Sequence, residues 1–231
     1  MTAGKVNLVV VAHPDDEILG FGATGAKLVA AGEIVQPVIL CGSVDARTRR
    51  PTDEQLFADM TEANRRVGFQ QPVLGEFPNI RMNTVEHLAI VQFVEAQVLA
   101  FQPHRIFTHH RSDLNDDHKQ VCGATLAASR LFQRRPDVRP LEALLLMEVP
   151  SSTDWGFSGA GQEPFQPNTY VEIGDYLDLK LEALRCYRNV MRDFPHSRSP
   201  EALRGLAAYR GAQCGLGPAE AFQTIFRSSL G

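Results

Sequence analysis

The sequence has few of the features that mark several large classes of protein. Its four cysteines are scattered over 231 residues without a CxxC-type pair, so the pattern predicts reduced thiols rather than a disulfide framework. It has no apolar run of the roughly 18 to 20 residues that a membrane-spanning helix needs. Acidic residues (27) outnumber basic ones (23), giving a net charge of -4, and this balance argues against a nucleic-acid-binding surface.

The chain also contains no internal repeat, no low-complexity tract and no linker rich in Gly and Ser. Its first apolar run, residues 6–12, is short and ends in charged side chains rather than at a small-residue cleavage site, which is unlike a signal peptide. At 44% hydrophobic and 22% charged residues, the composition is typical of a globular protein with a sizeable core. We therefore expect one cytoplasmic domain over residues 1–231, with neither a membrane nor a nucleic acid as its partner.

Segments of strand and helix character alternate over the first 150 residues. This alternation predicts an α/β fold with a Rossmann-like, mostly parallel sheet flanked by helices. Strands are expected at residues 6–12, 33–41, 73–74, 105–109 and 141–149. Helices are expected at residues 18–31, 52–67, 84–100, 119–132, 175–191, 201–214 and 218–227. We expect residues 151–231 to form a cap and the closing helices over the carboxyl edge of the sheet.

The stretch from residue 9 to residue 17 joins an apolar strand directly to a cluster of potential metal ligands. Three valines and an alanine are followed by His13, Pro14, Asp15, Asp16 and Glu17. In open α/β sheets, ligands bind outside the carboxyl ends of the strands. The cluster therefore lies where this architecture places its functional sites.

A second polar cluster follows another predicted strand, residues 105–109, and it ends at His118. Together with His13 and Asp16, His118 would complete a set of two imidazoles and one carboxylate. Three protein ligands and an open position for water are the arrangement of catalytic zinc, whereas structural zinc sites are closed by four ligands. Iron(II) oxygenases use the same donor types, so these residues alone leave both metals open.

The two clusters together resemble the LmbE/PIG-L family of zinc-dependent N-deacetylases. The resemblance rests on AHPDDE at residues 12–17 paired with DLNDDH at residues 113–118, and it extends to residues 180–187, 210–211 and 219–222. It implies one Zn2+ per chain, with another divalent metal as the alternative. It also implies removal of the acetyl group from an N-acetylglucosamine-type sugar or conjugate, and a homo-oligomer as one possible assembly.

Carried over by position, the resemblance implies His13, Asp16 and His118 as the metal ligands and Asp15 as the general base. Zinc lowers the pKa of its bound water toward neutrality. A neighbouring carboxylate that does not bind the metal can then take a proton while the water attacks the amide carbonyl. The products would be acetate and a free amine.

Asn115 departs from the pattern of the family. Better-known members carry a histidine three residues before the last metal ligand, with an oxyanion or general-acid role. An amide can donate a hydrogen bond to an oxyanion, but it cannot deliver a proton. The proton for the leaving amine is therefore expected from Asp15 or from one of the histidines His109, His110 and His196.

Other polar residues near these clusters are assigned supporting or substrate-binding roles. Asp117 is expected to orient a neighbouring side chain, and Glu17 to cap the following helix or brace a ligand. Contacts with the substrate, or with an anionic group on it, are expected from Arg81, His110, Asp113, Arg198 and Arg47.

The predicted function is therefore a zinc-dependent amidohydrolase acting on the linear amide of an N-acetyl sugar. Two alternatives stay open from the sequence. One is an iron(II) oxygenase, although a ready base such as Asp15 beside the metal suits hydrolysis better. The other is a non-catalytic sugar-binding module that holds a metal, and the complete set of ligands plus base argues against it.

Overall fold

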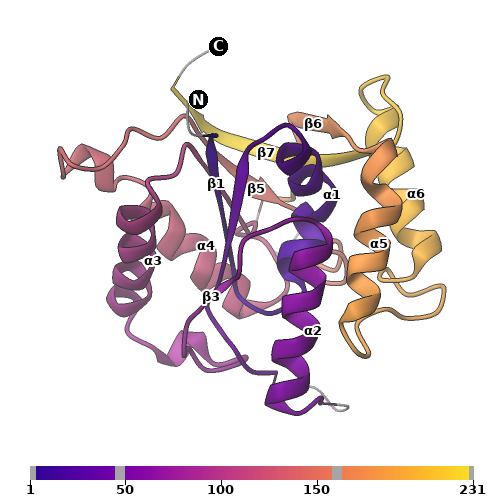
Figure 1. Cartoon of the computed structure of the whole chain (residues 1–231), viewed down its shortest axis with the longest axis horizontal. Helices are drawn as coiled ribbons and strands as arrows, with labels where there is room; N and C mark the ends of the chain where they lie inside the picture. The colour runs from indigo at the N-terminus through magenta and orange to yellow at the C-terminus, as the bar shows by residue number, and fades with distance from the viewer. Residues whose placement is uncertain (1–3, 45–49, 158–162, 229–231) are drawn as a thin grey trace.

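The computed structural model describes residues 4–44, 50–157 and 163–228. A central sheet is covered by helices on both faces, with α3 and α4 on one face and α1, α2, α5 and α6 on the other (Figure 1). The predicted Rossmann-like α/β fold is thereby confirmed. The helices are α1 (Asp16–Ala30), α2 (Asp53–Arg66), α3 (His87–Phe101), α4 (Asp116–Ala128), α5 (Leu177–Cys186) and α6 (Pro200–Ala212).

The described residues form one seven-stranded sheet with the order β3-β2-β1-β4-β5-β7-β6. Strand β7 runs antiparallel to both of its neighbours, and the pairs from β3 to β5 are parallel. The first strand pairs with β2 on one side and with β4 on the other, so the strand order reverses direction at β1. The strands are β1 (Val6–Val11), β2 (Ile34–Ile39), β3 (Val73–Leu74), β4 (Arg105–Thr108), β5 (Ala143–Met147), β6 (Thr169–Glu172) and β7 (Ala219–Arg227).

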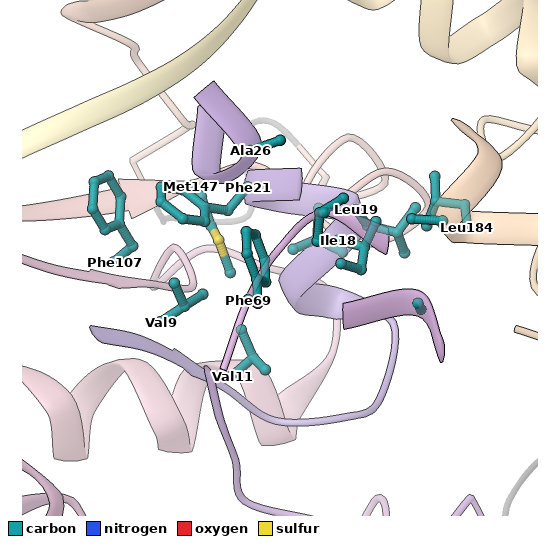
Figure 2. Close-up of a cluster of buried hydrophobic side chains, with 14 of the residues drawn as sticks. Val9, Val11, Ile18, Leu19, Phe21, Ala26, Phe69, Phe107, Met147 and Leu184 are labelled. Atoms are coloured by element: carbon teal, nitrogen blue, oxygen red, sulfur yellow. The ribbon is translucent and has the colours of Figure 1, made fainter. Parts of the chain in front are cut away.

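Side chains of β1 alternate between two hydrophobic cores, one on each face of the sheet. Val9 and Val11 pack with α1, while Leu8 and Val10 pack on the face that α3 and α4 cover. Figure 2 shows the first core, in which Phe21 of α1 lies between Phe69 and Phe107. Because β1 is buried on both faces, its sequence is continuously apolar.

Helix boundaries follow local signals in the sequence. The Thr52 hydroxyl accepts a hydrogen bond from the Gln55 amide, and the Gln55 side-chain oxygen accepts one from the Thr52 amide, which is the capping box that starts α2. Gly32 and Gly68 follow α1 and α2 with φ angles of 84° and 78°, values that glycine adopts without strain. Within the described residues, no helix is long and apolar enough to cross a membrane.

The predicted closing helix at residues 218–227 is wrong, because this segment forms strand β7. Its sequence contains Ala and Glu, which favour helices, but Phe222, Thr224, Ile225 and Phe226 favour a strand. The segment pairs with β5 on one side and β6 on the other. Strands β6 and β7 therefore extend the sheet beyond β5. Only part of the C-terminal segment forms helices.

Candidate metal centre

The two polar clusters meet at the carboxyl ends of β1 and β4, which are neighbours in the sheet. The loop after β1 carries His13 and Asp15, and α1 begins at Asp16. The loop after β4 leads to α4, which holds His118 in its first turn. Because the strand order reverses at β1, the helices that follow its neighbours lie on opposite faces and leave room for a ligand at this edge.

Three donor atoms from these loops converge on one point. His13 Nδ1, Asp16 Oδ2 and His118 Nε2 form a triangle with sides of 3.2, 3.3 and 3.4 Å. All three residues are buried, with at most 6% of their surface exposed. In a tetrahedral zinc site with bonds of about 2.0–2.1 Å, neighbouring ligand atoms stand roughly 3.3 Å apart. The triangle therefore has the size of one face of a zinc tetrahedron, and the residues fit the metal.

Each imidazole is held by a carboxylate on its outer nitrogen. His13 Nε2 lies 2.9 Å from Asp117 Oδ2, and His118 Nδ1 lies 3.0 Å from Asp113 Oδ2. With these two nitrogens donating, the inner nitrogens keep their lone pairs for a cation. Carboxylates in this position fix the tautomer and the orientation of metal-binding histidines.

The supporting carboxylates are themselves anchored. Asp117 accepts hydrogen bonds from the backbone amides of Ile80 and Met82 at 2.6 and 2.9 Å. Asp113 accepts hydrogen bonds from the hydroxyls of Ser152 and Thr153. The sequence predicts a substrate contact for Asp113, but its carboxylate is fully buried and directed at His118. Asp113 is therefore placed to orient His118, one of the three candidate metal ligands.

Electrostatics at this point favour a cation. Although burial opposes charge, the Asp16 and Asp113 carboxylates raise the pKa of the His118 imidazole to about 10. Burial likewise opposes ionisation of Asp16, but the imidazoles of His118 and His13 hold its pKa well below the usual range. The site therefore attracts either a proton or a metal ion, and a metal must displace the proton to bind.

Asp15 lies next to this group without joining it. Its backbone has a φ of 106°, in the region that favours glycine, and its amide donates a hydrogen bond to Glu17 Oε2 at 3.0 Å. Its carboxylate Oδ2 lies 3.3 Å from Arg198 Nη1. This arrangement leaves Asp15 beside the ligand set as a separate carboxylate.

Glu17 is fully buried, and its Oε2 accepts the hydrogen bond from the Asp15 amide. Its Oε1 accepts hydrogen bonds from the Tyr187 hydroxyl and from Asn64 Nδ2. Burial raises the pKa of Glu17 to about 7, although the hydrogen bonds from Tyr187 and Asn64 work against this shift. Sequence reasoning does not find Tyr187 or Asn64 as site residues. Tyr187 falls within the segment that resembles the family, but nothing in its own pattern indicates a contact with Glu17.

Arg198 and His196 lie in the turn before α6. Arg198 Nε donates to Ser151 Oγ at 2.5 Å, so the guanidinium is anchored on one side and contacts Asp15 on the other. The Arg198 amide donates to His196 Nδ1 at 3.0 Å. Burial, with the charges of Arg198 and Arg192, lowers the pKa of His196. A lowered pKa weakens the case for His196 as the proton donor.

The other two histidine candidates follow β4. His109 stacks on His118 with ring centroids 3.8 Å apart, and its Nε2 accepts a hydrogen bond from the Ala12 amide. Its pKa is lowered to about 3, chiefly by burial and then by the charge of His118. His110 contacts Phe165 and lines a cavity of about 190 Å³, and burial lowers its pKa as well. Both imidazoles are therefore neutral near pH 7.

His109 also belongs to a second convergent group, with Asp113 and His118. This group shares His118 with the first triangle. The Nε2 of His109 and the carboxylate of Asp113 are already used by hydrogen-bond donors. The first triangle is the better candidate for a metal, because carboxylates face the outer nitrogens of both of its imidazoles and leave the inner nitrogens directed at one point.

The remaining predicted residues lie around the site. Asn115 caps α4, and its Oδ1 accepts a hydrogen bond from the Asp117 amide at 3.0 Å. Only its Nδ2 is left as a donor toward a substrate. Arg81 is exposed, between the two amides that hold Asp117. Arg47 lies outside the described residues.

The fold and the convergent His–Asp–His group define a Rossmann-like protein with a candidate mononuclear metal centre. The profile of the PIG-L family, described as GlcNAc-PI de-N-acetylase, matches residues 8–129. This match spans both polar clusters and more than half of the chain. The chain therefore belongs to the PIG-L family. No curated protein matches the sequence.

Solved structures share the fold over nearly the whole chain. A conserved protein from Thermus thermophilus is 24% identical with a TM-score of 0.78, and the match covers 97% of this chain and 96% of that one. GalB, the 4-carboxy-2-hydroxymuconate hydratase from Pseudomonas putida, is 17% identical with a TM-score of 0.79, covering 98% of both chains. The N,N'-diacetylchitobiose deacetylase from Pyrococcus horikoshii is 20% identical with a TM-score of 0.75, covering 96% of this chain and 84% of that one.

Proposed function

We propose that this protein is a zinc-dependent deacetylase that hydrolyses the acetamide of an N-acetylglucosamine-type sugar or conjugate. The observation that carries the proposal is the triangle of His13, Asp16 and His118, with Asp15 beside it as a carboxylate outside the ligand set. Membership of the PIG-L family supports it. The chitobiose deacetylase with the same fold supports the substrate class.

His13, Asp16 and His118 would hold the metal, which supplies Lewis-acid polarisation of the amide carbonyl and activation of a water molecule. Asp15 would accept a proton from the attacking water as its oxygen bonds to the carbonyl carbon. Asp15 would then return that proton to the amine nitrogen as the C–N bond breaks. The products are acetate and the free amine, with no change of oxidation number at any atom.

The proton donor is assigned to Asp15 because the alternatives are weaker. His109 and His110 have lowered pKa values and are buried. Asn115 has no proton to give, but its Nδ2 would donate a hydrogen bond to the developing oxyanion. One carboxylate would thus serve first as base and then as acid.

The test is a panel of N-acetylated sugars and conjugates assayed for acetate and free amine, with purified protein loaded with Zn2+. We expect release from at least one member of the panel, loss of release with a chelator and recovery when Zn2+ is restored. Activity that depends on oxygen and on iron(II) would establish the oxygenase instead. Sugar binding without release by the zinc-loaded protein would establish the non-catalytic module.

A second candidate is the addition of water to an unsaturated carboxylate. The observation that favours it is Arg198, whose guanidinium lies at Asp15 and would suit a substrate carboxylate. The hydratase from Pseudomonas putida has the same fold. The same panel therefore includes conjugated unsaturated carboxylates, for which hydration is followed as loss of ultraviolet absorbance. Turnover of these compounds without acetate release from any N-acetyl compound would select the hydratase.

A further inference from the structure

The backbone of Asp15 adopts a conformation that non-glycine residues rarely adopt. Its φ and ψ are 106° and -27°, and such strained backbone geometry persists only where the surrounding structure holds it. The turn it creates is tight, because the His13 amide donates to Asp16 Oδ2 at 2.9 Å and the Asp16 amide donates to His13 O at 3.3 Å. A defined set of contacts must therefore keep Asp15 in place between two metal-binding residues.

One of these contacts comes from Glu17. The Asp15 amide donates to Glu17 Oε2 at 3.0 Å, so the carboxylate of Glu17 binds the backbone of Asp15 from below. The other oxygen, Oε1, accepts hydrogen bonds from Tyr187 Oη and Asn64 Nδ2. Tyr187 directly follows α5 and Asn64 belongs to α2, so two helices remote in sequence fix the carboxylate that fixes Asp15.

Burying the trio of Glu17, Asn64 and Tyr187 lowers the stability of the fold, so a purely structural role does not explain these residues. Their exposed fractions are 0%, 1% and 2%, and they lie among residues of a hydrophobic core. Buried polar groups destabilise the fold unless they are fully paired. Asn64 Oδ1 has no hydrogen-bond partner among the described residues, so the amide is retained for the donor Nδ2 at a cost in stability. Apolar side chains would fill the same space without that penalty.

We propose that Tyr187 and Asn64 are positioning residues that act through Glu17 to hold Asp15 at the metal centre. Neither residue is among the three that converge on the metal position. Their effect is on the backbone of Asp15, and so on the direction in which its carboxylate points. The catalytic part of this proposal rests on the proposed role of Asp15 as the base.

The first measurement is independent of activity. In zinc-loaded protein, Tyr187→Phe removes the hydroxyl donor, and Glu17→Gln replaces the carboxylate with an amide of the same shape. We expect amide hydrogen exchange at Asp15 to become about tenfold faster or more, the factor expected for a weakened hydrogen bond. Exchange in α3, which packs on the opposite face of the sheet (Figure 1), should not change. Tyr209→Phe is the matched control, because Tyr209 is 60% exposed.

The second measurement is the split between kcat and KM on the best substrate. Tyr187→Phe should lower kcat by about 100-fold, the effect of a small displacement of a reacting group. KM and the zinc content should stay within error of the wild type, since the ligands and the substrate contacts are untouched. A purely structural role would lower the folded fraction of the protein without changing kcat per zinc-loaded molecule.

Each result decides the matter. Unchanged exchange at Asp15 in both variants overturns the proposal, as does faster exchange with an unchanged kcat. If the wild-type protein turns over no substrate but Asp15 exchange accelerates in the variants, the positioning holds and the deacetylase assignment fails. If Tyr187→Phe does not fold, Glu17→Gln and Asn64→Leu carry both measurements.

Discussion

The carboxylate of Asp113 accepts a hydrogen bond from His118 Nδ1 at 3.0 Å, while the opposite nitrogen of the same ring lies 3.2 Å from Asp16 Oδ2. One imidazole thus connects a buried carboxylate to the candidate metal position. With Asp113 accepting from Nδ1, Nε2 is directed at the candidate metal position. The orientation of His118 therefore depends on a residue outside the three that form the candidate metal position.

Replacing Asp113 with Asn should weaken metal binding more than it weakens folding. An amide in this position is a poorer acceptor, and loss of such a partner typically costs about 10- to 100-fold in metal affinity. Competition with a fluorescent zinc chelator measures the change. Asp116→Asn is the matched control, because Asp116 lies in the first turn of α4, as His118 does, but is exposed. Equal zinc affinities for wild type and Asp113→Asn would refute the supporting role.

Asp15→Asn should abolish most of the turnover and leave zinc in place. An amide cannot accept the proton from the attacking water, and loss of a general base costs on the order of 10²–10⁴-fold in rate. Asn tolerates the left-handed conformation better than most residues, so the turn at position 15 should persist. Zinc content by atomic absorption and kcat by acetate release are measured on the same sample. A near-normal rate in this variant would contradict the assignment of Asp15 as base.

Metal affinity should rise with pH. Asp16 and Asp113 raise the pKa of His118 to about 10, so this imidazole carries a proton at neutral pH that zinc must displace. The apparent affinity should increase about tenfold per pH unit from about pH 6 to about pH 8 for each proton released. Proton release on adding zinc to weakly buffered protein gives the stoichiometry directly. An affinity that does not change with pH would mean that His118 is neutral before the metal binds.

The raised pKa of His118 has the opposite consequence for folding: the stability of the metal-free protein should fall as the pH rises. The pKa of His118 is higher in the folded protein than its ordinary value of 6.5. Its contribution to stability is therefore fully present below about pH 6.5 and is lost as the pH rises toward about 10. Denaturant titrations of chelated protein should show this loss of stability, whereas zinc-loaded protein should not.

The sequence was sufficient for the fold class and for bringing the candidate ligands to one edge of the sheet. His13 and Asp16 are three residues apart, and His118 follows a strand that the alternation of segments identifies. These are local signals, and parallel strands place their carboxyl ends side by side. The sequence pattern alone is therefore enough to predict that these three residues converge.

Contacts between remote segments could not be predicted in this way. Glu17 is 47 residues from Asn64 and 170 residues from Tyr187, and neither partner lies in a recognisable pattern of polar side chains. The helix prediction for β7 fails because pairing with β5 and β6 decides the conformation, and neither partner is visible in the segment itself. The contact between Asp113 and His118 could not be predicted either, because the sequence does not show where a side chain in a loop points.

Arg198→Met tests whether the guanidinium acts on the base or on the substrate. Methionine keeps much of the aliphatic stem but removes the donor that lies 3.3 Å from Asp15 Oδ2. With a neutral N-acetyl sugar, kcat should fall by about tenfold or more, the size of one lost charge-assisted hydrogen bond, and KM should stay unchanged. Arg204→Met, which breaks only a surface pair with Asp178, is the control. A rise in KM confined to anionic substrates, with kcat preserved, would instead show that Arg198 leaves Asp15 to bind the substrate anion.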